Sequence, residues 1–291
     1  MRAEQQASVE RLGAYGLHLP DLSAASELLL PAPEEWPTWR IERRDGGGQP
    51  TEFVEPDRAR LRAEPSGWVE IERASSCARF HFPTAPADRE LVHPYLAPTA
   101  SVIARWHGLQ SFHAGAFVAG GRAWAVLGAK GAGKSSLLAR LALDGVGILT
   151  DDVLVVRGTD GLAGPRCIDL RPASAAALGV GEPLGVVGTR ERWRVPAGAV
   201  EPRVRLGGWI RLDWGEPAIE PLPASEALPA IFASLSLRLE PTDPPALMEL
   251  LTLPALILRQ PQRIEELSRT ADRLLRHLGE AVAQEAFLSG P

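Results

Sequence analysis

The segment between residues 128 and 135 follows the pattern G-x-x-x-x-G-K-S and constrains the fold more than any other part of the chain. Glycines at positions Gly128, Gly131 and Gly133 allow positive φ angles and leave no Cβ between the backbone and a ligand. Successive N–H groups can then form a nest for an anion, and a following helix adds the positive end of its dipole. This loop, Gly128–Ser135, is called the glycine loop below, and it requires a strand before it and a helix after it.

The flanking segments have the periodicities that the glycine loop requires. Two short apolar runs, Ala116–Ala119 and Ala123–Leu127, are separated by two glycines and predict a hairpin. After the loop, leucines at helical spacing predict a helix over Ser135–Asp144. The next apolar runs, Val146–Thr150 and Val153–Arg157, predict two strands. The sequence therefore predicts an α/β core, within a protein that is α+β overall.

The glycine loop predicts a binding site for a nucleoside triphosphate, which we expect to be ATP with Mg²⁺. Lys134 would place its ammonium group against the β- and γ-phosphates, and the Ser135 hydroxyl would bind Mg²⁺. ATP, GTP and pyrophosphate all fit such a loop, so the sequence leaves the phosphate donor open. The residues assigned to the nucleotide are Gly128, Ala129, Lys130, Gly131, Ala132, Gly133, Lys134, Ser135 and Ser136.

Two adjacent aspartates, Asp151 and Asp152, follow the strand predicted over Val146–Thr150. A carboxylate at the end of the strand next to such a loop is where P-loop proteins hold Mg²⁺ or its water shell. A second carboxylate can act as a general base toward an attacking hydroxyl. Two neighbouring carboxylates raise each other's pKa unless a cation lies between them, and magnesium is the natural cation here. The alternative is an acidic strand end that is merely solvated.

Residues 1–105 differ in character from residues 106–291. Short apolar runs with frequent turn formers predict an N-terminal antiparallel β-rich region, which serves either as a scaffold or for substrate docking. The predicted strands are Ala14–Leu19, Trp39–Glu42, Trp68–Glu72 and Arg79–Phe82. Residues 106–291 are predicted to form the catalytic domain. An amphipathic helix over Gln262–Phe287 ends it, and we expect this helix to pack on the catalytic core rather than on a partner.

Composition excludes several classes of protein. The formal charge of −5 offers no support for nucleic-acid binding. We predict that Cys77 and Cys167, the two cysteines, are isolated buried thiols in a reducing compartment. The N-terminus carries no apolar run typical of a signal peptide, and no stretch approaches the length of a membrane span. We therefore predict a cytoplasmic protein with no membrane partner.

Residues 113–152 resemble the catalytic domain of HPr serine kinase/phosphorylase. The resemblance rests on His113 fifteen positions before Gly128, on the glycine loop, and on the Asp151-Asp152 pair that begins 23 positions after Gly128. It implies a P-loop kinase core related to phosphoenolpyruvate carboxykinase. It also implies that Asp151 takes the proton of a serine hydroxyl, that Asp152 lies next to the metal, and that His113 lies near the phosphates. A purely structural role is the alternative for His113.

Two further segments resemble that family less closely. Asp169-Leu170-Arg171-Pro172 resembles the family's Glu-Ile-Arg-Gly, which implies that Asp169 helps to bind magnesium and that Arg171 stabilises transferred phosphate. A solvated loop pair is the alternative. A basic run with Arg192 and Arg194 falls where the family has a mobile basic loop, and we select these two as candidates for contact with the substrate phosphate. The candidate catalytic residues are Asp151, His113, Lys134, Arg171, Arg192 and Arg194, and the candidate metal ligands are Ser135, Asp152 and Asp169.

The departures from the family concern the substrate and the reverse reaction. The segment after Arg171 lacks the glycine-rich signature of the family's well-known members, and Ser136 stands where they have Glu. These differences leave open whether the reverse reaction, phosphate-driven dephosphorylation, occurs, and they indicate a divergent member of the family. The resemblance implies a kinase that phosphorylates a Ser or Thr hydroxyl on a protein or peptide, such as the precursor of a lasso peptide. An NTPase with water as acceptor and a non-enzymatic, nucleotide-responsive binding protein are the alternatives. The family is often oligomeric, and the sequence leaves the oligomeric state open.

Overall fold

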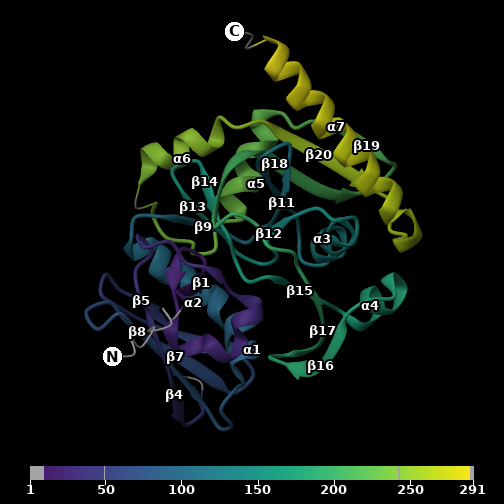
Figure 1. Ribbon diagram of the computed structural model, residues 1–291. Coiled ribbons are helices and arrows are strands. Elements are labelled where there is room, and N and C mark those ends of the chain that lie inside the picture. The colour runs from purple at the N-terminus through teal and green to yellow at the C-terminus, as the bar shows by residue number, and fades with distance from the viewer. Residues whose placement is uncertain (1–9, 49, 242, 289–291) are drawn as a thin grey trace, which may run out of the picture.

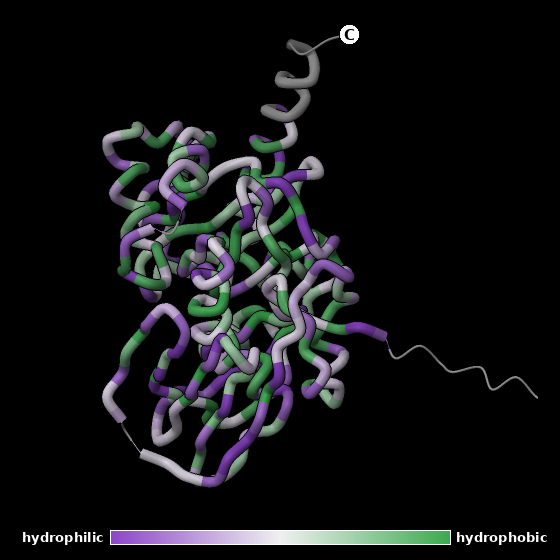
Figure 2. Tube along the Cα trace, turned by 90° about the vertical axis from the view of Figure 1, so that its left-hand side faces the viewer, coloured by the Kyte–Doolittle hydropathy of each residue, from purple (hydrophilic) through white to green (hydrophobic). Residues whose placement is uncertain are grey.

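The structure, a computed structural model, describes residues 10–48, 50–241 and 243–288. These residues form a mixed α/β structure with several sheets and seven α-helices. In Figure 1 the N-terminal third, coloured purple to blue, lies below the large sheet that the rest of the chain builds. Hydrophobic segments gather in the interior, as the green parts of the tube in Figure 2 show.

The largest sheet has nine strands and leads into the glycine loop. Its strands are β9 (Gln110–Phe112), β10 (Gly115–Ala119), β11 (Arg122–Leu127), β12 (Ile148–Thr150), β13 (Leu154–Arg157), β14 (Asp160–Leu162), β18 (Arg203–Trp214), β19 (Ala218–Pro221) and β20 (Ala255–Gln260). Their order is β12-β10-β11-β18-β14-β13-β9, while β20 pairs with β18 and β19 pairs with β20. The strands β11, β18 and β20 are parallel, so their carboxyl ends share one edge of the sheet. The hairpin and the two strands predicted around the loop are confirmed.

Two helices cover one face of this sheet. Helix α3 (Lys134–Leu143) follows the glycine loop, and α7 (Leu267–Leu288), after the turn η3 (Ile264–Glu266), lies beside it (Figure 1). Both helices contribute to one buried cluster with residues of the sheet such as Ile210. The helical residues of this cluster include Leu137, Leu138 and Leu141 of α3 and Ala271, Leu274 and Leu278 of α7. The expected packing of the C-terminal helix on the core is therefore confirmed.

The other face of the sheet is covered by different helices. Trp209 points to this face because side chains alternate along β18, and its indole N–H donates a hydrogen bond to the Leu250 carbonyl oxygen at 2.9 Å. Leu250 belongs to α6 (Pro244–Leu251), which packs there with α5 (Ala224–Ala233). The sheet is thus buried on both faces, as its runs of apolar residues require.

The N-terminal sheet is mixed, which corrects the prediction of an antiparallel region. Its strands are β4 (Arg40–Asp45), β5 (Phe53–Val54), β6 (Arg58–Ala63), β7 (Gly67–Glu72) and β8 (Cys77–Phe82), in the order β4-β8-β7-β6-β5. Strand β4 is parallel to β8, and the other pairs are antiparallel. After β4 the chain crosses the end of the sheet to its far edge, and the Gly46 and Gly48 N–H groups donate to backbone carbonyls of β8 and of the β6–β7 turn on the way.

Another expected strand, Ala14–Leu19, is a tight hairpin instead. Positive φ angles at Tyr15 (59°) and Gly16 (81°) reverse the chain between β1 (Leu12–Ala14) and β2 (Leu17–His18). Two consecutive residues with positive φ form the turn that suits the twist of a two-residue hairpin. Strand β3 (Leu30–Pro31) completes this small sheet.

Helix α2 (Leu96–Trp106) is a feature that the sequence analysis did not predict. Nine of its eleven residues are buried, among them Thr99 and Ser101. Proline usually ends or interrupts a helix, and Pro94 and Pro98 stand just before and inside the first turn of α2, so no clear helix signal is present there in the sequence. The short elements before it are η1 (Pro20–Leu28), α1 (Asp88–Glu90) and η2 (Leu91–Tyr95).

A third small sheet lies beside the glycine-loop end of the molecule (Figure 1). It consists of β15 (Cys167–Leu170), β16 (Glu182–Val187) and β17 (Arg190–Pro196), in the order β15-β17-β16. Helix α4 (Pro172–Leu178) connects β15 to β16. This sheet carries Asp169 and the basic run, so its placement decides how these residues meet the glycine loop.

The remaining predictions about organisation have different outcomes. Cys77 and Cys167 are buried and free, as expected. The boundary after residue 105 stays a prediction, because one buried cluster includes residues on both sides of it, such as Val102 and Phe112. Within the ranges that the structure describes, no helix is long and apolar enough to cross a membrane.

The packing of α7 predicts a stability difference between two leucines. Leu274 is fully buried in the cluster shared with α3, whereas Leu143 at the end of α3 is 42% exposed. We expect Leu274→Ala to lower the free energy of unfolding by about 2–5 kcal/mol, because it removes buried surface and leaves a cavity. Leu143→Ala should cost less than about 1 kcal/mol. Urea denaturation measures both, and equal effects would contradict the packing of α7 on the core.

Candidate active site

The backbone of the glycine loop has the conformation that its glycines permit. Strand β11 ends at Leu127, and positive φ angles follow at Gly131 (89°) and Gly133 (93°) before α3 begins. A Cβ on Gly133 would lie 2.9 Å from the Gln260 side-chain nitrogen, so a side chain has no room there. The first N–H groups of α3 have no acceptor inside the helix and remain available to an anion.

The ammonium group of Lys134 lies against the loop itself. Its Nζ donates a hydrogen bond to the Gly128 carbonyl oxygen at 2.7 Å, and the residue is 9% exposed. Burial lowers the pKa of Lys134, although the nearby Asp152 and Asp151 oppose this shift. The loop therefore holds a buried cation beside two carboxylates.

A cavity of about 420 Å³ brings most of the predicted site residues together. Those that line it are His113, Lys130, Gly131, Gly133, Lys134, Ser135, Ser136, Asp151, Asp152, Asp169, Arg171 and Arg192. Four residues without a predicted role, Leu170, Ser174, Thr189 and Arg190, also line the cavity. The predicted residues Gly128, Ala129, Ala132 and Arg194 do not line it.

Asp151 lies at the buried end of this cavity and is 6% exposed. Its Oδ2 accepts a hydrogen bond from the Asp169 N–H at 3.2 Å, while its Oδ1 is buried and has no hydrogen-bond partner among the described residues. Burial, and then the charge of Asp152, raise the pKa of Asp151 to about 7, against the opposing hydrogen bonds from Ser135 and the Asp169 backbone. Asp151 thus has one oxygen available to a cation or a proton.

Asp152 and His113 form the more open part of the site. The His113 Nδ1 lies 3.4 Å from the Asp152 Oδ1, and the two side chains are 52% and 41% exposed. His113 reaches this position from the turn between β9 and β10, whose backbone is fixed by a hydrogen bond from the His113 N–H to the Ser234 carbonyl oxygen. The structure therefore brings His113 to the aspartate pair, although the two are far apart in sequence.

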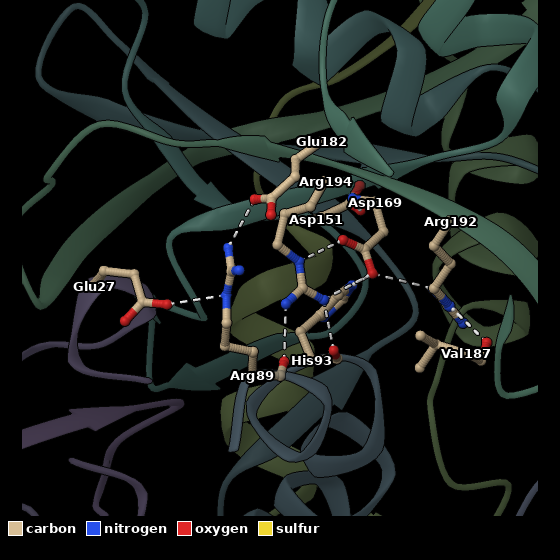
Figure 3. A network of polar contacts seen from close by, with 9 residues as sticks. All are labelled: Glu27, Arg89, His93, Asp151, Asp169, Glu182, Val187, Arg192 and Arg194. Carbon is tan, nitrogen blue, oxygen red and sulfur yellow. Dashed lines mark hydrogen bonds and ion pairs between the residues drawn. The ribbon is translucent and has the colours of Figure 1, made fainter. Parts of the chain in front are cut away.

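Asp169 belongs to a buried network of polar contacts (Figure 3). Arg194 donates to both of its oxygens, from Nε to Oδ1 at 2.8 Å and from Nη2 to Oδ2 at 3.0 Å. Two further N–H groups of Arg194 bind the carbonyl oxygens of Arg89 and His93 at 2.8 and 2.7 Å. Arg194 is thus a buried partner of Asp169 and does not line the cavity, which does not fit a direct contact with substrate phosphate.

The charge state of this network follows from its partners. Burial would raise the pKa of Asp169, but the bound guanidinium of Arg194 and the nearby Arg192 more than compensate and hold this pKa below its ordinary value. Burial also lowers the pKa of His93, which favours the neutral imidazole 3.7 Å from the Asp169 Oδ2. Because both Asp169 oxygens are bound by Arg194, they are poorly placed to serve as metal ligands.

The hairpin between β16 and β17 supplies the basic side of the cavity. The Arg192 Nε donates to the Val187 carbonyl oxygen at 3.0 Å, and its Nη1 lies 3.5 Å from the Asp169 Oδ2 (Figure 3). Burial and the neighbouring Arg190 lower the pKa of Arg192. On the glycine-loop side, the Ser136 hydroxyl donates to the Ser174 hydroxyl at 3.1 Å and connects α3 to α4.

Several residues reach the site only through tertiary structure and carry no signal in the sequence. His93 and the Arg89 carbonyl come from the N-terminal region, where no pattern in the sequence pointed to chemistry. Arg190 belongs to the same basic run as Arg192 and Arg194. Because the three arginines stand at alternate positions of one strand, their spacing gave no reason to choose Arg190. Ser174 lies in the segment after Arg171, where the glycine-rich signature of the HPr kinase family is missing and no other pattern indicated a role.

The donor set fits a magnesium ion that is bound mainly through phosphates. Mg²⁺ usually takes one or two carboxylates together with substrate oxygens and water, rather than a complete set of protein ligands. Among the described residues, no three His, Cys, Asp or Glu side chains are grouped as a metal site. A site of this kind needs only a few oxygen atoms from the protein. The structure offers the unpartnered Oδ1 of Asp151, the exposed carboxylate of Asp152 and the Ser135 hydroxyl.

Comparison with solved structures finds chains that are similar to this one. The HPr(Ser) kinase/phosphatase from Coxiella burnetii matches 61% of this chain and 99% of its own, with 13% sequence identity and a TM-score of 0.32. This similarity is too low to assign a fold or an activity. No protein-family model and no curated protein matches the chain.

The Arg194–Asp169 pair predicts a large cost when one partner is removed. We expect Arg194→Met to lower the free energy of unfolding by about 3–5 kcal/mol, because Asp169 is then left buried without its partner. Arg190→Met, at a partly exposed position on the same strand, should cost less than about 1 kcal/mol. Urea denaturation at pH 7 measures both values.

The pH dependence of this difference supplies its control. The folded chain lowers the pKa of Asp169, so the pair contributes fully above the unfolded-chain pKa of about 3.9 and loses its contribution as the pH falls through the folded value. The difference between wild type and Arg194→Met should therefore shrink in acid. A difference that stays constant down to pH 3 would show that the effect does not come from the Asp169 charge.

Proposed function

We propose that this chain is an ATP-dependent kinase that transfers the γ-phosphoryl group to a Ser or Thr hydroxyl of a protein or peptide. The observation that carries the proposal is the single cavity that contains Lys134 and Ser135 of the glycine loop together with Asp151, Asp152 and His113. A binding loop alone would support nucleotide binding. The buried carboxylate beside it supports a reaction.

The glycine loop would hold the phosphates through its N–H groups and Lys134. A bound Mg²⁺ would supply positive charge to the transferred group, and Ser135 and Asp152 are the residues that could hold it. Catalysis in phosphoryl transfer is mainly positioning and charge stabilisation, for which the cavity offers Lys134 and Arg192 as cations.

Asp151 is the residue that we propose as the general base. It lines the cavity beside the glycine loop, and the Asp169 N–H fixes one of its oxygens, so the other can accept the proton of an acceptor hydroxyl. His113 and Asp152 lie at the more exposed part of the cavity, where an acceptor can approach. Arg190 and Arg192 would complete the charge balance around the transferred phosphoryl group.

The shape of the cavity bears on which molecules could accept the phosphoryl group. A hydroxyl must reach Asp151 past exposed side chains, which suits a Ser or Thr on a flexible segment better than one on a rigid surface. The precursor of a ribosomal peptide such as a lasso peptide is the specific hypothesis that the sequence resemblance suggests. A cytoplasmic location and a homo-oligomer also remain hypotheses.

Substitution of Asp151 tests its role as the base. We expect Asp151→Asn to bind ATP with nearly unchanged affinity and to lower the rate of phosphoryl transfer by about a hundredfold or more, since an amide cannot accept the proton. Asp160→Asn, at a strand outside the cavity, should leave both quantities unchanged. Calorimetry measures binding and a radiolabel assay measures transfer. Retained transfer by Asp151→Asn would remove Asp151 as the base.

Mass analysis of peptides tests the proposed reaction. With ATP and Mg²⁺, a peptide library with a fixed central Ser and randomised flanks should gain the mass of one phosphoryl group, and the matched library with central Ala should not. If ATP is hydrolysed at the same rate with and without the library, and no peptide gains a phosphoryl group, the result would favour an NTPase with water as acceptor. Tight ATP binding with neither turnover nor transfer would favour a nucleotide-responsive binding protein.

A further inference from the structure

The parallel strands of the main sheet place two side chains next to the glycine loop. Strands β11, β18 and β20 end at Leu127, Trp214 and Gln260, and the last two residues are paired across the sheet. Ligands of α/β sheets bind outside the carboxyl ends of such strands. Trp214 and Gln260 therefore occupy the sheet edge from which the glycine loop departs, on the side away from Asp151 and Asp152.

A second cavity, of about 620 Å³, opens at this position. It shares Gly131, Gly133, Ser136 and Ser174 with the first cavity, so the two adjoin each other at the glycine loop. Its other walls come from α4, from Trp214 and from the segment between β20 and α7. A ligand whose phosphates lie on the loop could extend into it past Ser136.

Trp214 gives this cavity a flat aromatic wall. It is 41% exposed, which is unusual for the largest apolar side chain in a protein with a well-packed core. Its indole ring lies against the loop, since a Cβ on Gly133 would be 3.2 Å from the Trp214 Cη2. An exposed ring beside a phosphate-binding loop is suited to stack on the base of a nucleotide.

Gln260 adds an unsatisfied polar group to the same wall. The residue is 3% exposed, and its amide nitrogen donates a long hydrogen bond of 3.4 Å to the Ala132 carbonyl oxygen. This orientation leaves the amide oxygen as an acceptor, and it is buried without a partner in the described parts of the chain. Buried acceptors are normally satisfied, and a donor on a ligand in the adjoining cavity would satisfy this one.

We propose that the second cavity binds the aromatic base of the nucleotide whose phosphates occupy the glycine loop, with the base stacked on Trp214. This inference rests on the proposed function and sharpens it. The glycine loop alone accepts ATP, GTP or pyrophosphate, whereas a base site beside it selects a nucleoside triphosphate over a phosphate chain without a base. Gln262 and Glu265, which also line the cavity, offer polar groups to the ribose.

Calorimetry on the full-length protein with Mg²⁺ tests the base site, with ATP and inorganic tripolyphosphate as the two probes. Wild type should bind ATP more tightly than tripolyphosphate. Trp214→Ala should weaken ATP binding about tenfold and leave tripolyphosphate binding unchanged, because only the stacking contact is lost. Trp214→Phe, which keeps a ring, should retain most of the ATP affinity. Phe232→Ala removes an aromatic side chain of similar exposure, 44%, outside the cavity and should change neither affinity.

The outcomes separate this inference from the proposed function. If Trp214→Ala leaves ATP binding unchanged, or weakens both ligands equally, the base does not stack on Trp214 and the inference falls while phosphate binding stands. Equal affinities of wild type for ATP and tripolyphosphate would also overturn it. If wild type binds neither probe, the proposed kinase itself is wrong.

Discussion

The parallel alignment of β11, β18 and β20 is the constraint on which the site depends. Parallel strands present all their carboxyl ends at one edge, and β11 uses this edge to start the glycine loop. Strand β18 is buried in the centre of the sheet between helices on both faces, so the edge is held rigidly. The loop can therefore keep the positive φ angles of its glycines and its buried lysine. The same alignment places Trp214 and Gln260 beside the loop.

A second interaction connects the N-terminal region to this edge. Arg194 binds both oxygens of Asp169 and two carbonyl oxygens from the segment at Arg89 and His93. The N–H of Asp169 in turn binds Asp151, so the N-terminal region supports the candidate base through one buried arginine. Residues 1–105 therefore have at least a structural role at the site.

The glycine loop and its flanks were predictable because their signals are local. The pattern Gly128–Ser135, the strand–loop–helix order and the aspartates after the next strand all lie within one segment, from Arg122 to Asp152. Features that depend on long-range packing were not predictable. Helix α2 gave no clear signal because prolines stand at its start, and β4 gave no sign that its partner β8 would run parallel to it. Arg194 matched a basic loop by position, but only the structure shows that its donors are already bound. The roles assigned to the site residues remain predictions.

The central claim is that the cavity transfers phosphoryl groups to a hydroxyl and does not simply hydrolyse ATP. The ratio of phosphate incorporated into peptide to ADP formed tests it most directly. The proposed kinase predicts a ratio near one with a Ser-centred peptide library, and ADP formation that falls sharply when the library is omitted. A ratio near zero, with the same rate of ADP formation with and without the library, would contradict it.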